Sequence, residues 1–477
     1  MASVSSEHAP PSRGREFVRM HARLLDSLPF GVRLREAFER AYGLFADGSD
    51  SSMVRRLAGA AFLIRVVSAA LTFVSQILLA RWIGGHEFGI YIYGWTWVLL
   101  IGGMVDLGLG SAAQRFIPQY TEQRNFALLR GFLGGSRWLA LLFGSIAGAV
   151  GALVKLLTPH IDAATVVPLY LSCASLPLFG VWSAQSGIAR SYNWVNLGLS
   201  PVYVQRPILL LALMGLIWAL GFPTDAVTAT LVGVVALTSV GLAQIVMLNR
   251  RLAGVVENGP RSYAARTWLA VSAPIFLVEA FYYLLTYSDI IVLKQFRSAD
   301  DVAIYYAASK TIALVAFIYY SVAQTIAHKF VQYDVSGDRV GLAAFLKQSV
   351  RLTFWPSLVV IVGLLALGHP LLRLFGREFT SGYYLMFIIA IGLLARASVG
   401  PAERLLNMLG ERRSCALIYA ASFAISLILC VVMIPRFGLA GAAAASSIAL
   451  VFESASLFLI SKYRLGLHCF IFGGPRA

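Results

Sequence analysis

The stretch ILLARWIGGHEFGIYIYGWTWVLLIGGMVDLGLGSAAQRFIP, residues 77–118, decides the organisation of the chain. A first apolar helix ends at Trp82, two glycines form a turn, and a second apolar helix opens at Phe88 and closes on residues 106–109. Aromatic residues gather beside the turn, and the carboxylate of Asp106 lies near the far end of the second helix. This pattern is typical of two membrane spans joined by a minimal loop.

The composition predicts a membrane protein made of helices. Of the 477 residues, 58% are hydrophobic and only 13% are charged, against about 25% charged residues in soluble domains. Apolar runs of roughly 20 residues recur, which is the length that crosses a bilayer as a helix. The four cysteines have no paired spacing, and no HExxH, paired-cysteine or glycine-rich phosphate motif is present. We therefore expect an all-α polytopic fold with no metal site and no enzymatic centre.

Twelve spans are expected, six in each half of the chain. The predicted spans are 58–82, 88–109, 136–157, 163–187, 201–221, 225–248, 267–290, 302–327, 350–368, 380–400, 414–434 and 439–461.

The distribution of basic residues predicts how these spans are oriented. With the N-terminus placed in the cytoplasm, the inner segments collect 27 of the lysines and arginines and the outer loops collect seven. This asymmetry indicates a plasma-membrane protein with both termini cytoplasmic. The net charge of +16 is therefore explained by the positive-inside rule, and no nucleic-acid partner is expected. The outer loops are all short, the longest being about 291–301, so they hold no catalytic domain.

The same segments suggest five regions. The N-terminal tail is polar and rich in arginine and shows no secretory signal. Residues 16–28 and 32–45 within it can form amphipathic helices on an anionic membrane surface. A cytoplasmic tail without such helices is the alternative. The regions are a cytoplasmic tail 1–56, a first six-helix bundle 57–248, a cytoplasmic linker 249–266, a second six-helix bundle 267–464 and a cytoplasmic tail 465–477.

An internal repeat relates the two halves. When the chain is shifted by 214 residues, ILLARWIGGHEFGIY at 77–91 aligns without a gap with IVLKQFRSADDVAIY at 291–305. The first and second spans thereby match the seventh and eighth in the same orientation. The sequence therefore predicts two pseudo-symmetric six-helix bundles related by an axis along the membrane normal, with a substrate path between them.

Three charges lie deep inside predicted spans, where each costs roughly 2.5–3.5 kcal/mol. They are Arg65, Glu279 and Lys310, and the 214-residue shift makes Arg65 equivalent to Glu279. One interpretation is a structural ion pair that joins the two halves. The other is a polar lumen whose cations meet an anionic substrate and whose carboxylate couples to an ion.

Four further charges lie nearer the span ends. Arg206 and Arg396 are close to the inner ends of their spans, where long side chains can instead extend to lipid headgroups. Asp106 either stabilises a turn or contributes to ion coupling, and Asp289 is either a gate or an interfacial residue. Tyrosines at 282, 283, 287, 305 and 306 are suited to lining a sugar path, although tyrosine is also common at membrane interfaces.

The residues also resemble a known family. LARWIGGHEFGIYIYGW and DLGLGSAAQRFIP, followed by SDIIVLKQFRSADDVAIYYAASKT, FGREFTSGYYLMFIIAIGLLARASVGPAERLLNMLGERR and IPRFGLAGAAAASSIAL, are similar to the polysaccharide-transport, O-antigen flippase-like family. That family belongs to the multidrug/oligosaccharidyl-lipid/polysaccharide exporter superfamily. The resemblance covers residues 55–464, and the 56-residue basic tail is longer than is usual in the family.

The resemblance implies a flippase that moves a lipid-linked oligosaccharide, typically on undecaprenyl diphosphate, through a cation-lined cavity between two bundles. Position and charge then suggest the roles. Arg65, Lys310, Arg206 and Arg396 are candidates for binding the anionic headgroup, and Glu279, Asp106 and Asp289 are candidates for ion coupling. No cofactor is expected beyond a coupling proton or sodium ion. Expected partners are the lipid-linked oligosaccharide, membrane lipids and polysaccharide assembly enzymes.

Three alternatives remain at this point. A drug or metabolite antiporter of the same superfamily would favour more carboxylates than cations in its cavity. A polysaccharide polymerase or glycosyltransferase would need a larger outer loop with catalytic carboxylates. A scaffold of a cell-envelope complex would tolerate neutralisation of its intramembrane charges.

Overall fold

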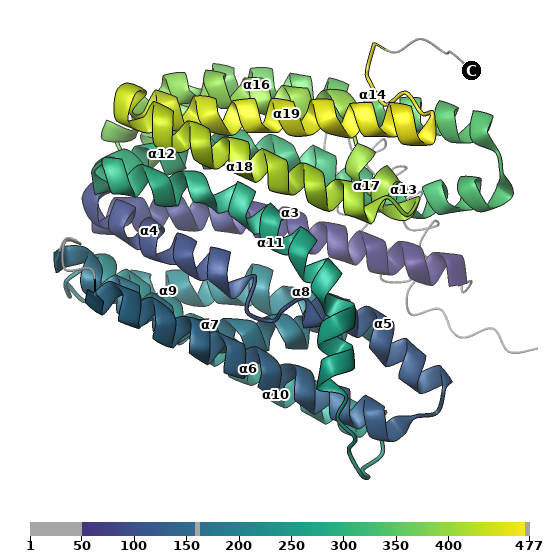
Figure 1. Cartoon of the computed structure of the whole chain (residues 1–477). Helices are drawn as coiled ribbons and strands as arrows, with labels where there is room; N and C mark the ends of the chain where they lie inside the picture. The colour runs from purple at the N-terminus through teal and green to yellow at the C-terminus, as the bar shows by residue number, and fades with distance from the viewer. Residues whose placement is uncertain (1–49, 158–162, 473–477) are drawn as a thin grey trace, which may run out of the picture. The chain divides into compact units, whose positions relative to one another are not determined.

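The computed structural model describes residues 50–157 and 163–472 (Figure 1). The chain divides into two compact units, residues 1–60 and 61–477. Of the first unit, only the opening turns of one helix, from Asp50 onward, are described. The amphipathic segments expected at 16–28 and 32–45 lie outside the described residues.

Helices make up the described part of the chain, which contains no strand. The first half holds α3 (Asp50–Ile83), α4 (Gly85–Gly102), α5 (Leu109–Glu122), α6 (Phe126–Leu157), α7 (Ala163–Ser191), α8 (Val195–Ser200), the π-helical turn η1 (Pro201–Gln205), α9 (Arg206–Ala219) and α10 (Ala226–Ala253). The second half holds α11 (Ala265–Phe296), α12 (Ala299–Ile312), η2 (Ala313–Val315), α13 (Ala316–Ser336), α14 (Arg339–Ala366), α15 (Gly368–Phe375), η3 (Glu378–Gly382), α16 (Tyr383–Val399), α17 (Ala402–Met408), α18 (Arg412–Phe437) and α19 (Leu439–Leu465).

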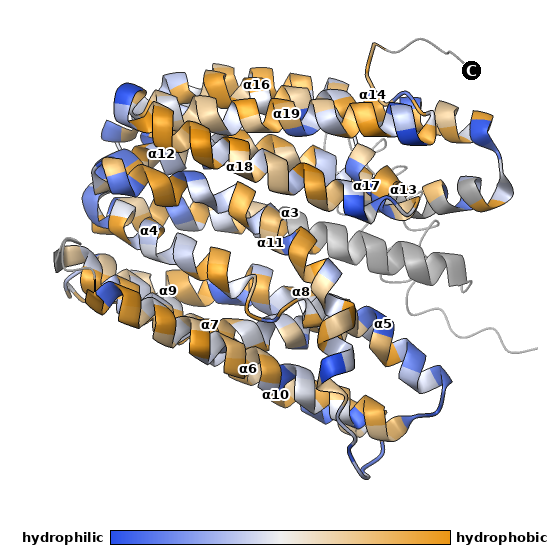
Figure 2. Cartoon of the chain, in the orientation of Figure 1, coloured by the Kyte–Doolittle hydropathy of each residue, from blue (hydrophilic) through white to orange (hydrophobic). Residues whose placement is uncertain are grey.

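The predicted all-α membrane fold is confirmed. Within residues 50–157 and 163–472, ten helices are long and apolar enough to cross a membrane, and Val67–Ile83 forms a shorter apolar helix. Figure 2 shows apolar residues along the helices and polar residues gathered at their ends and loops. Large apolar side chains such as Leu142, Ile146 and Val150 of α6 are exposed, as expected where the solvent is lipid.

The second span differs from its prediction. A helix was expected to run from 88 to 109, but α4 ends at Gly102 and α5 begins at Leu109. Between them the chain turns through Leu107 and Gly108, whose φ angles are 51° and 72°. The Asp106 carboxylate accepts hydrogen bonds from the backbone N–H groups of Gly108 (3.0 Å) and Gly110 (3.2 Å), and it thereby satisfies free donors at the start of α5.

The connection expected at 291–301 is also shorter than predicted. Helix α11 continues to Phe296, and only Arg297 and Ser298 separate it from α12. Ser298 caps α12 by accepting a hydrogen bond from the N–H of Asp301 (3.2 Å), which satisfies one of the free donors at the helix start.

The internal repeat is confirmed at the junction of the two halves. Helices α4 and α12 begin at 85 and 299, so the helix starts follow the sequence shift. His86 Nδ1 lies 2.8 Å from Asp300 Oδ2, and these two residues are 214 positions apart. Since equivalent residues touch, the pseudo-two-fold axis passes between them. Beside this contact, Gly89 of α4 packs directly on the backbone of Ala299.

This close approach predicts a stability effect at Gly89. A Cβ atom at this position would overlap the carbonyl oxygen of Ala299, so Gly89→Ala is expected to destabilise the protein by about 1–3 kcal/mol. The measurement is the thermal unfolding midpoint in detergent. Gly233→Ala is the matched control, because its Cβ would meet the Trp95 ring at an ordinary 3.6 Å. Equal midpoints for the two variants would contradict the close packing of α4 on α12.

Candidate functional site

Arg206 is a half-buried cation at a break in a membrane-spanning helix. It follows the π-helical turn η1 and opens α9, and such turns are often found at functional sites. The guanidinium carbon of Arg206 lies 3.8 Å from the centre of the Trp95 ring on α4. Its Nε and Nη2 atoms are buried and have no hydrogen-bond partner within the described chain. Because unpaired buried donors are costly, this guanidinium is suited to receiving an anion.

Lys310 of α12 is a second cation in a tyrosine-rich environment. Its ammonium lies 5.4 Å from the ring centre of Tyr306 and 5.6 Å from that of Tyr287 on α11. No carboxylate of the described residues lies within ion-pair distance of Lys310, although Asp289 is near enough to attract it electrostatically. Tyr287 also stacks on Tyr283 one turn earlier, with ring centres 6.3 Å apart. This surface combines a cation with aromatic faces, which is a suitable combination for an anionic sugar conjugate.

Asp289 is held by groups from two other helices. Its Oδ2 accepts hydrogen bonds from the hydroxyl of Tyr305 on α12 (2.6 Å) and from the hydroxyl of Ser446 on α19 (3.2 Å). Asp289 therefore joins α11 to α12 and α19 within the second half. It also lies near enough to Lys310 to interact with it electrostatically.

Glu279 and Asp106 lie close together near the start of α5. Glu279 Oε1 accepts a hydrogen bond from the hydroxyl of Ser111 (2.6 Å), and Asp106 Oδ2 accepts one from Ser183 (2.7 Å). Arg190 of α7 interacts electrostatically with both carboxylates. The predicted partner of Glu279 was Arg65, which lies in α3 and whose side chain is outside the described part, so that pairing stays a prediction.

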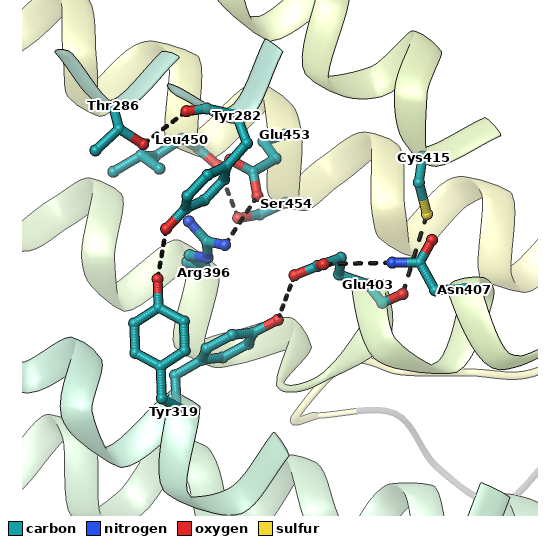
Figure 3. Close-up of polar contacts among 11 residues, drawn as sticks. Tyr282, Thr286, Tyr319, Arg396, Glu403, Asn407, Cys415, Leu450, Glu453 and Ser454 are labelled. Atoms are coloured by element: carbon teal, nitrogen blue, oxygen red, sulfur yellow. Dashed lines mark hydrogen bonds and ion pairs between the residues drawn. The ribbon is translucent and has the colours of Figure 1, made fainter. Parts of the chain in front are cut away.

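Arg396 of α16 lies in a different environment from the other two cations. Its Nη2 is 3.5 Å from Oε1 of Glu453 on α19, and that carboxylate is 0% exposed. Its guanidinium also lies 5.1 Å from the ring centre of Tyr319. Figure 3 shows this pair among the helices of the second half. Arg396 is therefore largely buried and is paired within the second half.

Tyrosines extend the polar network around this ion pair (Figure 3). Tyr319 donates a hydrogen bond to Glu403 Oε2 (3.0 Å), and the hydroxyls of Tyr282 and Tyr320 are 2.6 Å apart. Asn407 donates to the other oxygen of Glu403 (3.3 Å). The network links α11, α13, α16, α17 and α19, so it fixes the core of the second half.

Three residues of these clusters were not anticipated from the sequence. Glu453 lies inside the predicted span 439–461. The cost of a charge inside a span, which singled out Glu279, therefore applies to Glu453 as well. Arg190 and Glu403 lie just beyond predicted spans, and only the folded structure brings them to the buried groups. No group of three or more histidine, cysteine or acidic side chains is placed to hold a metal ion in the described ranges.

The sequence matches a family model over more than half of its length. Residues 55–327 match the family described as polysaccharide biosynthesis protein. A Shigella flexneri protein that carries the name O-antigen transporter is 24% identical over 400 residues, which cover 79% of this chain and 90% of that protein. A Haloferax volcanii protein that carries the name low-salt glycan biosynthesis flippase is 21% identical over 404 residues, 81% of this chain and 79% of that protein.

Solved structures share the fold. An inward-facing multidrug resistance MATE family transporter of the MOP superfamily superposes with a TM-score of 0.68 at 14% identity, over 85% of this chain and 98% of that one. The lipid II flippase MurJ in an inward closed conformation superposes with a TM-score of 0.64 at 17% identity, over 84% and 87% of the two chains. At these identities the likeness concerns the fold alone.

The buried ion pair yields a prediction that separates a structural role for Arg396 from a binding role. Glu453→Leu leaves the buried Arg396 unpaired and is expected to destabilise the protein by about 3–5 kcal/mol. Adding Arg396→Met should recover most of that loss, because an apolar pair of similar size needs no charge compensation. Thermal unfolding in detergent measures both variants. Unchanged stability of Glu453→Leu would show that the pair does not hold α16 to α19.

Proposed function

The chain belongs to the polysaccharide biosynthesis protein family, and on this premise we propose that it is a flippase for a lipid-linked oligosaccharide. The substrate is an oligosaccharide on a polyprenyl diphosphate, which the protein moves across the plasma membrane by alternating access for surface polysaccharide synthesis. The names of the Shigella and Haloferax relatives support this proposal.

One observation carries the proposal: two cations lie inside the spans without an ion-pair partner among the described residues. Arg206 and Lys310 each face aromatic rings, and each would gain electrostatically from an anion. A diphosphate supplies that charge, and sugars supply surfaces that stack on tyrosine rings. The polyprenyl tail can remain in lipid, so the protein needs to shield only the headgroup. No step of this transport needs a covalent reaction.

The two cations are assigned to the diphosphate, and Arg65 is assigned with them from its position in the sequence. Arg396 is proposed to act on the substrate indirectly, because its charge is already balanced by Glu453. Glu279, with Asp106 and Asp289, is proposed to couple transport to a proton or sodium ion. A gradient of either ion imposed across proteoliposomes should change the flipping rate, and no response to either would remove this assignment.

The orientation follows from charge. Both termini are placed in the cytoplasm, because the segments assigned to that side carry 27 lysines and arginines against seven on the other side. The starts of α4 and α12 then lie at the outer face of the plasma membrane. The proposed functional partners are the enzymes that supply the lipid-linked precursor and those that lengthen it.

Deletion of the gene tests the function directly. We expect surface polysaccharide to be lost while the lipid-linked precursor is still made and accumulates in the cytoplasmic leaflet. Leaflet-resolved labelling of the precursor is the measurement. Normal polysaccharide with altered drug tolerance would instead indicate an antiporter. Precursor that reaches the outer leaflet but is never lengthened would indicate an enzyme.

The cations give a second test. Lys310→Gln and Arg206→Gln are each expected to lower the transport rate by roughly tenfold or more, since a hydrogen bond to a charged group contributes about 1.5–3 kcal/mol. Flipping in proteoliposomes is the measurement, and size-exclusion profiles report folding. Lys462→Gln is the matched control, because Lys462 is exposed in the last turn of α19. Full transport by both folded variants would refute the assignment of the two cations to the substrate.

A further inference from the structure

A cavity lies in the first half of the chain, and its lining includes none of Arg206, Lys310 and Glu279. It is an open cavity of about 590 Å³, lined by α6, α7, α10 and the connection between α10 and α11. Most of the lining is apolar, and its polar members include Arg130, Arg137, Gln185, Asn249 and Arg261. Glu257 is the one acidic residue in the lining, so arginines outnumber carboxylates there.

Two side chains in this cavity have unused hydrogen-bonding capacity. Gln185 is 0% exposed, and neither its amide nitrogen nor its oxygen has a partner in the described part of the protein. Arg137 donates from Nη1 to Asn249 (2.7 Å), but its Nε and Nη2 atoms are buried and unpartnered there. Buried polar atoms are normally satisfied, so the unpartnered donors, Nε and Nη2 of Arg137 and the amide nitrogen of Gln185, are suited to a ligand with anionic oxygens.

The wall formed by the connection is fixed in place. Arg130 donates hydrogen bonds to the carbonyl oxygens of Pro260 (2.9 Å) and Glu257 (3.0 Å). The N–H of Ser262 donates to the carbonyl of Ala127 (2.9 Å). These hydrogen bonds therefore hold the connection between α10 and α11 against α6 at the cavity.

The surroundings of the cavity identify the kind of ligand. Trp138, which lines it, is 69% exposed, and Leu242 on α10 is 54% exposed. An exposed tryptophan beside arginines is typical of the level of lipid headgroups, and the apolar faces of α6 and α10 continue from there along the hydrocarbon. We propose that this cavity binds an anionic phospholipid of the membrane, with its phosphate at Arg137 and Gln185 and its acyl chains along α6 and α10.

Binding to the purified protein tests this site without any measurement of transport, so its outcome is independent of the proposed function. The probe is dioleoylphosphatidylglycerol, compared with dioleoylphosphatidylcholine, and native mass spectrometry counts the bound lipid. The wild-type protein should retain phosphatidylglycerol preferentially. Arg137→Gln should weaken that binding by roughly tenfold or more, because it removes a charge-assisted contact. Arg250→Gln is the control, since Arg250 is exposed at the same end of α10 but does not line the cavity.

Every outcome decides the assignment. Equal retention of the two lipids, or equal phosphatidylglycerol binding by wild type and Arg137→Gln, would overturn it. Displacement by millimolar inorganic phosphate would assign the cavity to a soluble anion instead. Displacement by a polyprenyl diphosphate at lower concentration would assign it to the transported substrate. If Arg137→Gln does not fold, Gln185→Leu replaces it, and the same loss of phosphatidylglycerol is expected.

Discussion

The structure depends on one constraint, which is that a charge or a free backbone group inside the hydrocarbon region must be satisfied by the protein itself. Helices satisfy the backbone, so the described chain is helical almost throughout. The charges are then satisfied in different ways. Arg396 has the buried Glu453, Asp289 has two hydroxyl groups, and Asp106 has backbone N–H groups and Ser183. Arg206 and Lys310 have aromatic faces but no carboxylate within ion-pair distance among the described residues.

This difference separates residues that hold the fold from residues that are available to a ligand. Neutralising one member of a closed pair destabilises the protein, because the other charge remains buried. A buried cation without a carboxylate at ion-pair distance is stabilised when an anion binds beside it. Lys310 and Tyr287 lie on helices that also carry the Asp289 contacts, so an anion at Lys310 would compete for the same charge as Asp289.

The sequence predicted the spans well because a run of roughly 20 apolar residues has few other stable forms in a membrane. It also predicted the two halves, because the shift that aligns Gly85 with Ala299 reflects a real pair of helix starts. The prediction missed the end of α4 at Gly102. The turn that follows α4 includes the hydrogen bond from the Gly108 N–H to the Asp106 carboxylate, which a hydropathy pattern does not reveal. The sequence did not predict the pairing of Arg396 with Glu453, because this pairing depends on how α16 and α19 pack against each other. The domain boundaries and the role of Arg65 remain predictions.

The junction of α4 and α12 limits how the two halves can move. At this end Gly89 packs on the Ala299 backbone, His86 contacts Asp300, and Phe88 packs against Tyr306 and Phe379 with ring centres 6.0 and 6.2 Å apart. At the other end of α4, the hydrogen bond from Ser111 to Glu279 joins α5 to α11. Alternating access requires the halves to separate at each end in turn. Under the alternating access proposed above, these contacts must break for the halves to separate at this end, and among them the contact between His86 and Asp300 joins equivalent residues of the two halves.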